Sequence, residues 1–229
     1  CSSDLENRAV RDYLLKTLDD MGVDAQIHRD IRDWGRHTTY GGVGLVENVL
    51  ARIPGTGGEK AFAMMAHFDS VPYGPGAADD MSGVATMLES ARAIKAGPPL
   101  LNDVIFVFTN GEEGGLHGAK AFAEHPWAQE LGVILNMEAR GTRGPSYMFE
   151  TSLENGWLIE ELAASGVPAR ATSMMFDVYR RLPFSSDFNR LKDDVAGFNI
   201  AYVDNFPYYH TPNDSPENLN LASLQHHGE

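Results

Sequence analysis

The stretch AHFDSVPYGPGAADDMSG, residues 66–83, gathers polar residues of the types that bind metal ions. It contains His67, Asp69 and the pair Asp79 and Asp80, joined by a loop rich in Gly and Pro. Two divalent cations held close together need a carboxylate that bridges them, and each needs further imidazole or carboxylate ligands. Asp79 or Asp80 could provide the bridge. Asp69 is placed to accept the second ring proton of His67 and so to fix its tautomer.

Three further candidate ligands follow along the chain: Glu113 in NGEEGGLHGAKAF, Glu138 in LNMEARG and His210 in YYHTPND. Imidazole and carboxylate ligands without a thiolate favour zinc, with manganese or cobalt as tolerated substitutes. Taken singly, each motif also has an ordinary structural interpretation, because a His after a strand can simply pack and DDMSG can cap a helix. The metal hypothesis therefore requires all of these side chains to meet.

The segments that precede the candidate ligands are predicted to be buried strands. Three apolar runs lead directly into candidate residues: KAFAMMAHFD into His67, NDVIFVFTNGEE into Glu112 and Glu113, and LGVILNMEARG into Glu138. Helices are predicted between the runs, at 82–96 and 114–126, and this alternation indicates an α/β fold. We expect a three-layer α/β/α sandwich around a mixed, mainly parallel sheet. The carboxyl ends of its parallel strands would bring the candidate ligands to one edge. Further helices are predicted at 5–21 and 155–165, and further strands at 24–31, 44–55 and 197–203.

Composition narrows the function classes. The chain has 229 residues, of which 43% are hydrophobic, enough for the core of one domain, which we expect to span 1–229. Its net charge of -14 argues against a surface that binds nucleic acid or anionic lipid. The longest apolar runs fall far short of the roughly 18 residues that span a bilayer, which predicts a soluble chain without membrane contact of its own.

The ends of the chain and its single cysteine give two further expectations. Cys1 is the only cysteine, so no internal disulfide is expected. A helix is predicted to begin almost at the first residue, and the final SPENLNLASLQHHGE has helix-start residues without room to finish a helix. We expect a domain cut from a longer chain at both ends.

Taken together, four blocks resemble a known family. HFDSVPYGPGAADDMSG, NGEEGGLHGAKAF, LNMEARG and YYHTPND are similar, in this order, to the signature blocks of the co-catalytic dizinc aminopeptidases and their relatives. The sequence NMEARG, with GPSYMFET after it, resembles most the corresponding segments of the membrane-tethered metallopeptidases of the endoplasmic reticulum and vacuole and of their bacterial counterparts. The resemblance covers about residues 6–220. It implies a peptide substrate, two zinc ions and an extracytoplasmic location for the full-length protein, which could have membrane spans.

By position, the resemblance also implies roles for individual residues. One zinc would be bound by His67 and Glu138, and the other by Glu113 and His210. Asp79 would bridge the two ions, and its peptide bond to Asp80 would be cis. Further implied roles, in chain order, are the general base for Glu112, a supporting position near the pocket for Asp187 and a hydrogen bond to the oxyanion for Tyr209.

The position of Glu138 leaves the substrate end open. Many aminopeptidases of this family have Asp there, whereas related carboxypeptidases more often have Glu. Arg140, two residues along, could neutralise a substrate carboxylate or merely pair with a surface acid. The leading hypothesis is a dinuclear zinc aminopeptidase. The alternatives are a carboxypeptidase of the same family, a glutaminyl cyclase with one zinc, and a receptor or scaffold without metal.

Overall fold

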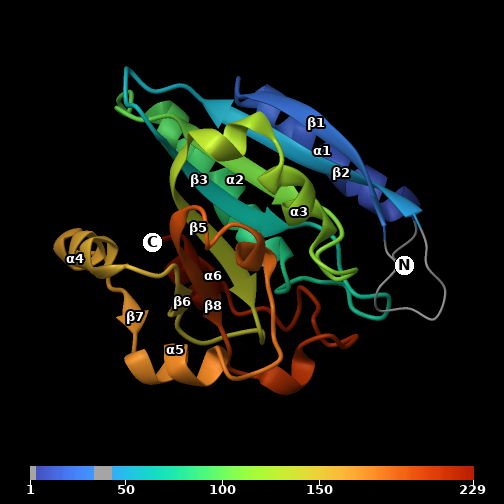
Figure 1. Ribbon diagram of the computed structural model, residues 1–229. Helices are drawn as coiled ribbons and strands as arrows, with labels where there is room; N and C mark the ends of the chain where they lie inside the picture. The colour runs from blue at the N-terminus through green and yellow to red at the C-terminus, as the bar shows by residue number, and fades with distance from the viewer. Residues whose placement is uncertain (1–3, 34–42) are drawn as a thin grey trace.

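A sheet of eight strands runs through the described part of the protein. The computed structural model describes residues 4–33 and 43–229 (Figure 1), so Cys1 lies outside the described residues. The strand order is β1-β2-β4-β3-β5-β8-β6-β7. Pairing is parallel for β3–β4, β3–β5, β5–β8 and β6–β7 and antiparallel for β1–β2, β2–β4 and β6–β8. The strands are β1 (Asp24–Asp33), β2 (Val43–Ile53), β3 (Ala61–His67), β4 (Val104–Thr109), β5 (Leu131–Ala139), β6 (Tyr147–Thr151), β7 (Arg170–Ala171) and β8 (Ala196–Tyr202).

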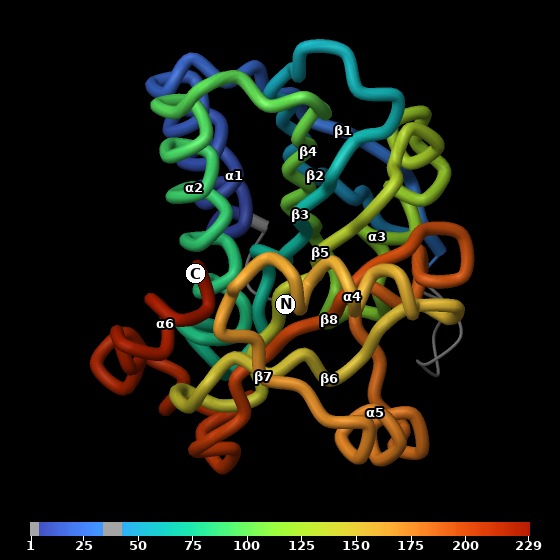
Figure 2. The backbone as a smooth tube through the Cα atoms, turned by 90° about the vertical axis from the view of Figure 1, so that its left-hand side faces the viewer, coloured from blue at the N-terminus to red at the C-terminus, as the bar shows by residue number. Residues whose placement is uncertain are grey.

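Helices cover both faces of this sheet, as the sequence predicts for a three-layer α/β/α sandwich. In Figure 2, α1 and α2 lie on one side of the central strands and α3 lies on the other. Helix α6 packs beside α2. The α-helices are α1 (Asp4–Asp20), α2 (Met81–Ala96), α3 (His117–Ala123), α4 (Gly156–Ala164), α5 (Ser173–Tyr179) and α6 (Leu221–Gly228).

Strand β4 shows why the central strands are apolar throughout. Its side chains alternate between the two faces. Phe106 and Phe108 join the core formed with α1 and α2, whereas Ile105 and Val107 join the core formed with α3. All four are fully buried. Burying a side chain of this size contributes about 1.5–3 kcal/mol, so a strand covered on both faces gains from an unbroken hydrophobic run.

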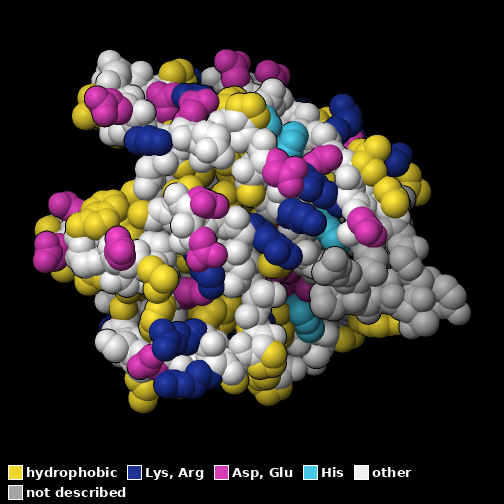
Figure 3. All heavy atoms as spheres, viewed as in Figure 1, with side chains coloured by type: hydrophobic (Ala, Val, Ile, Leu, Met, Phe, Trp, Pro, Cys, Tyr) yellow, Lys and Arg dark blue, Asp and Glu magenta, His cyan; other side chains and the backbone are white. Residues whose placement is uncertain are grey.

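The structure departs from the sequence prediction in several places, one of which is strand β6, which the sequence did not predict. The helix expected at 114–126 is shorter, because Leu116 adopts a left-handed conformation (φ 61°) and the helix begins only at His117. Between the helix at 155–165 and the strand at 197–203 the sequence predicts no element, yet the structure has β7 and α5 there. These elements are largely exposed, so they lack the continuous apolar pattern by which buried elements are recognised. Figure 3 shows hydrophobic side chains exposed over α4.

The carboxyl ends of the central parallel strands meet at one edge, as predicted. His67 at the end of β3 pairs in register with Thr109 at the end of β4, and β5 runs parallel to β3 on its other side. The loops that follow these strands therefore start side by side.

Candidate metal centre

Asp79 lies between two histidines that come from distant parts of the chain. Its Oδ1 atom is 3.4 Å from Nε2 of His67, and its Oδ2 atom is 3.0 Å from Nε2 of His210. His67 ends β3, whereas His210 follows the short 3-10 helix η3 (Phe206–Tyr208). The two oxygens of one carboxylate thus face two different imidazole rings, which is the arrangement that a bridging ligand needs.

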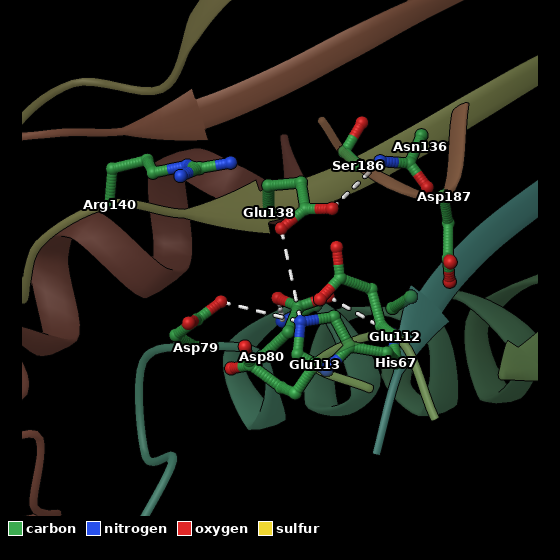
Figure 4. A network of polar contacts seen from close by, with 12 residues as sticks. His67, Asp79, Asp80, Glu112, Glu113, Asn136, Glu138, Arg140, Ser186 and Asp187 are labelled. Atoms are coloured by element: carbon green, nitrogen blue, oxygen red, sulfur yellow. Dashed lines mark hydrogen bonds and ion pairs between the residues drawn. The ribbon is translucent and has the colours of Figure 1, made fainter. Parts of the chain in front are cut away.

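A glutamate stands beside each histidine. Oε2 of Glu138, on β5, is 3.9 Å from Nε2 of His67 (Figure 4). Oε1 of Glu113, in the loop after β4, is 3.0 Å from Nε2 of His210. The structure therefore brings the five predicted ligands together as two His–Glu pairs on either side of Asp79. That these side chains bind metal stays a prediction.

These residues fit zinc in kind and in spacing. Ligand atoms of a tetrahedral zinc with bonds of about 2.0–2.1 Å lie about 3.3 Å apart, and the four separations above run from 3.0 to 3.9 Å. One ligand atom from each of His67, Asp79 and Glu113 lies within 4.8 Å of the others. Oε1 of Glu113 is buried and makes no hydrogen bond within the described ranges, although Nε2 of His210 is near. A cation between these two atoms would satisfy both.

The pKa values of the carboxyl groups in the site also favour bound cations. Burial raises the pKa of Glu138 to about 8, and it raises the pKa values of Asp80 and Glu112 well above the usual range. Burial acts in the same sense on Asp79, but hydrogen bonds from the two histidines outweigh it and lower its pKa to about 2. So many carboxyl groups beside only two imidazoles cannot all ionise unless their charge is neutralised, and divalent cations would neutralise it.

Asp69 contacts the loop of the adjacent glutamates with its carboxylate and the ring of His67 with its main-chain oxygen. Its Oδ1 accepts hydrogen bonds from the backbone N–H groups of Gly111 (2.7 Å) and Glu112 (3.1 Å), and its Oδ2 accepts one from Glu113 (3.2 Å). Nδ1 of His67 lies 2.9 Å from the main-chain oxygen of Asp69 but 3.7 Å from its Oδ1. Asp69 is therefore positioned to accept the ring proton of His67, as predicted, but with its main-chain oxygen, because the loop N–H groups occupy the carboxylate.

Both carboxylate oxygens of Asp80 accept hydrogen bonds from backbone N–H groups. Its Oδ1 accepts a hydrogen bond from the backbone N–H of Gly83 at 3.2 Å and so caps α2. Its Oδ2 accepts one from the backbone N–H of His67 at 3.3 Å. The peptide bond between Asp79 and Asp80 is cis, as the resemblance implies. Of the two candidates for the bridge, Asp79 is the one that faces both histidines.

Asp214 positions the Asp79 loop, and the sequence reasoning missed it. Its Oδ1 accepts a hydrogen bond from the backbone N–H of Ala78 at 2.7 Å, and its Oδ2 accepts one from Asp79 at 3.1 Å. Its own main-chain oxygen accepts a third, from Ala77 at 3.1 Å. Asp214 is buried and belongs to the block YYHTPND. The only signal was a carboxylate in a turn, a residue type that often bonds to nearby backbone.

Glu112 and Asp187 lie at the same edge of the sheet. Glu112 sits in the loop after β4, next to His67 and Glu138 in Figure 4. Asp187 begins the 3-10 helix η2 (Asp187–Arg190) and accepts a hydrogen bond from the hydroxyl of Thr109. Burial raises the pKa of Asp187 to about 6. Asp187 contacts none of the five predicted ligands directly within the described ranges, and its supporting role stays a prediction.

Tyr209 and Arg140 form one side of the site. The ring of Tyr209 stacks on the ring of His210 with centroids 3.7 Å apart. The guanidinium carbon of Arg140 lies 5.1 Å from the centre of the Tyr209 ring and 4.9 Å from that of Phe184, and one of its N–H groups donates to the main-chain oxygen of Ser185. No carboxylate lies within 4 Å of this guanidinium in residues 4–33 and 43–229, so it does not pair with a surface acid there.

An apolar pocket of about 340 Å³ opens beside Arg140. Helix α5 forms one wall of it with Met174, Met175 and Val178. Because α5 was not predicted from the sequence, this pocket was not expected. Other apolar side chains that line it are Phe149, Leu182, Phe184 and Phe206.

The chain is similar to known proteins both in sequence and in fold. It is 32% identical over 191 residues to "Endoplasmic reticulum metallopeptidase 1" of Mus musculus, a match that covers 80% of this chain but only 21% of that protein. A glutaminyl cyclase from Tannerella forsythia has the same fold, with a TM-score of 0.75 at 20% identity over 99% of this chain and 88% of that one. A leucine aminopeptidase precursor from Bacteroides thetaiotaomicron gives a TM-score of 0.76 at 18% identity, covering 99% and 87%.

At these low identities the two solved structures show the fold alone, whereas the sequence matches show more. Residues 48–229 match the family described as "Peptidase family M28". The resemblance inferred from the four sequence blocks is thereby confirmed, and so is the prediction of a zinc-dependent peptidase, a hydrolase, at the level of the family. The chain belongs to peptidase family M28.

Proposed function

We propose that this chain is the catalytic domain of a dinuclear zinc exopeptidase that removes residues from the amino end of peptides. The main support is the position of Asp79, whose two oxygens face His67 and His210 separately. Each histidine has a glutamate beside it, Glu138 or Glu113. Two sets of ligands that share one carboxylate are suited to two ions rather than one.

The chain's own residues then have distinct tasks in the reaction. Zinc held by the His–Glu pairs and Asp79 would polarise the scissile carbonyl and make water a stronger nucleophile. Glu112 takes a proton from the attacking water and passes it to the leaving nitrogen. The hydroxyl of Tyr209 donates a hydrogen bond to the oxyanion, and its ring is fixed by stacking on His210.

The resemblance of the four sequence blocks to those of aminopeptidases favours an amino end as the part of the substrate that enters the site. A carboxypeptidase remains the second candidate because of one observation. Arg140 faces the apolar pocket without a carboxylate partner in the described part of the chain, and a substrate carboxylate could provide one.

Zinc analysis combined with one conservative variant tests the proposal. We expect about two zinc ions per chain and release of amino acids from peptides whose amino end is free. Glu112→Gln should retain both ions but lose turnover by several orders of magnitude, because the ligands remain while the proton acceptor is gone. Glu89→Gln, an exposed change on α2, is the matched control and should leave both measurements unchanged.

The same measurements distinguish the alternatives. Cleavage that is indifferent to a blocked amino end would refute the aminopeptidase assignment in favour of the carboxypeptidase. One zinc per chain, with cyclisation of amino-terminal glutamine, would indicate a glutaminyl cyclase. A zinc content near zero would identify a receptor or scaffold.

The domain and its location are also proposals. One sheet runs through the described residues, which supports a single catalytic domain over 1–229. Within the described ranges no helix is both long and apolar enough to cross a bilayer. The mouse relative is named for the endoplasmic reticulum, and we propose an extracytoplasmic location for this domain. Protection from protease added outside intact membrane vesicles would test it.

A further inference from the structure

Glu138 is hydrogen-bonded to a neighbour on its own strand. Nδ2 of Asn136 donates to Oε1 of Glu138 at 3.3 Å (Figure 4). The two residues are two positions apart on β5 and therefore lie on the same face of the sheet. The oxygen that faces His67 is the other one, Oε2. Asn136 thus holds the side of the carboxylate that does not face the metal site.

Asn136 belongs to a row of buried polar side chains that crosses three strands. It pairs in register with Asn199 on β8, which in turn pairs with Glu150 on β6. Nδ2 of Asn136 also donates to Oδ1 of Asn199 at 2.9 Å, and Nδ2 of Asn199 donates to Oε2 of Glu150 at 3.1 Å. All three side chains are almost fully buried. In the middle of a sheet, apolar residues would otherwise fill such positions.

An ion pair at the far end fixes the direction of the whole row. Nζ of Lys192 donates to Oε1 of Glu150 at 2.6 Å. A carboxylate in an ion pair can only accept hydrogen bonds, so Asn199 must turn its NH₂ group toward Glu150. The carbonyl oxygen of Asn199 then faces Asn136, and this oxygen makes Asn136 present its own NH₂ group.

The same NH₂ group of Asn136 has a second hydrogen, which is directed at Glu138. If the amide were reversed, its oxygen would face the carboxylate of Glu138 and repel it. Ser186 adds to the fixed direction, since its hydroxyl oxygen accepts a second bond from Nδ2 of Asn199 at 2.7 Å.

We propose that Asn136, Asn199, Glu150 and Lys192 form a directional row of hydrogen bonds that positions Glu138 for metal binding. This inference depends on the proposed function in one respect, namely that Glu138 is a zinc ligand. Asn136 acts on Glu138 directly, and the other three act through it. Hydrogen-bond partners of metal ligands commonly contribute a factor of ten to a hundred in metal affinity.

A double-mutant cycle on zinc affinity tests this dependence. In the full-length protein, a chromophoric chelator would compete for zinc in Asn136→Leu, in Asn199→Leu and in the double variant. We expect Asn136→Leu to weaken binding of one zinc ion by about 10- to 100-fold and to spare the other. Asn199→Leu should weaken the same ion. In the Asn136→Leu background, Asn199→Leu should have less than about a twofold further effect, because it acts through the residue already removed.

Two comparisons separate positioning from a general loss of structure. Ser152→Ala removes another buried hydrogen bond between the β6 and β8 segments, from the backbone N–H of Gly197 to Oγ of Ser152, and it should leave zinc affinity unchanged. If the Asn→Leu variants do not fold, Lys192 offers a second route because its side chain is partly exposed. Lys192→Met should weaken the same ion, and Lys192→Arg should restore its affinity.

Each outcome decides one proposal. Two zinc ions in the parent protein, with unchanged affinity in Asn136→Leu and Lys192→Met, would overturn the positioning row and leave the proposed function intact. Equal weakening of both ions, or additive effects in the cycle, would also overturn it. Fewer than two ions in the parent protein would contradict the proposed function instead.

Discussion

Replacing Asp214 by Asn should destabilise the loop that presents Asp79, although the two side chains have nearly the same shape. The carboxylate of Asp214 accepts two hydrogen bonds, one on each oxygen, from the backbone N–H groups of Ala78 and Asp79. An amide has only one oxygen. In Asp214→Asn, an NH₂ group must therefore face one of these N–H groups at about 3 Å, a contact between two donors.

The cost can be worked out from the burial of these groups. A buried N–H that loses its acceptor costs about 1–3 kcal/mol. For a chain of this size each kcal/mol shifts the melting temperature by about 2–4 °C, so the zinc-free variant should melt about 2–12 °C lower. The main-chain bond from Ala77 to Asp214 is unaffected by the change, so the turn should persist. Zinc affinity should fall as well, because the backbone N–H of the predicted ligand Asp79 makes one of the two affected hydrogen bonds.

Calorimetry of the zinc-free protein and zinc competition with a chelator measure the two effects. Asn213→Ala, an exposed change at the adjacent position, is the control and should alter neither. If Asp214→Asn melts at the parental temperature and binds zinc as tightly as the parent, then Asp214 does not position Asp79 and the reasoning from its two hydrogen bonds is wrong.

Three further predictions concern the metal, the pocket and pH. Removing zinc with a chelator should lower the melting temperature, since ligand present at a thousand times its dissociation constant adds about 4 kcal/mol to the free energy of unfolding. Arg140→Met should raise KM about 10- to 100-fold for dipeptides with a free carboxylate but leave KM for their amides unchanged, and equal losses for both would mean that Arg140 only supports the Phe184 and Tyr209 rings. Burial, with a smaller contribution from His226, lowers the pKa of His227 to about 4. The unfolded chain binds that proton near pH 6.5, so the free energy of unfolding should fall by up to about 3 kcal/mol as the pH drops from about 6.5 to 4. Urea denaturation should show this fall in the parent protein and a smaller one in His227→Gln.

The central strands could be predicted from the sequence because their burial on both faces leaves an unmistakable local pattern. AFAMMAH and VIFVFT are apolar at every position but the last, and both became strands with bounds close to those expected. Helix α5 could not be predicted in this way. Its residues Met174 and Val178 are exposed at 71% and 51%, so its sequence SMMFDVY lacks the one-sided periodicity that marks a helix packed on a core.

His67, Glu113 and Glu138 could be placed together from sequence because each ends or follows a strand whose position the fold dictates, whereas Asp79 and His210 were placed by the resemblance to the family. Their detailed partners could not be predicted in this way. Asp69 was expected to accept the ring proton of His67, and its main-chain oxygen is placed to do so, whereas the loop after β4 brings three N–H groups to its carboxylate. Competition for an acceptor depends on segments far apart in the chain, which local spacing does not reveal.

Strand β5 shows where the limit of sequence reasoning lies. The spacing of Asn136 and Glu138 suffices to place both on one face of a strand, so their contact was within reach of the sequence alone. The hydrogen bonds that Asn199 and Glu150 add to this contact could not be predicted from the sequence, because they depend on the strand order β5-β8-β6 and its register. A polar residue in an otherwise buried strand costs free energy unless it is hydrogen-bonded. Such a residue therefore indicates that a hydrogen-bond partner exists, but only the order of the strands identifies the partner. Here the partners form a row of hydrogen bonds that runs from the partly exposed Lys192 to the predicted metal ligand Glu138.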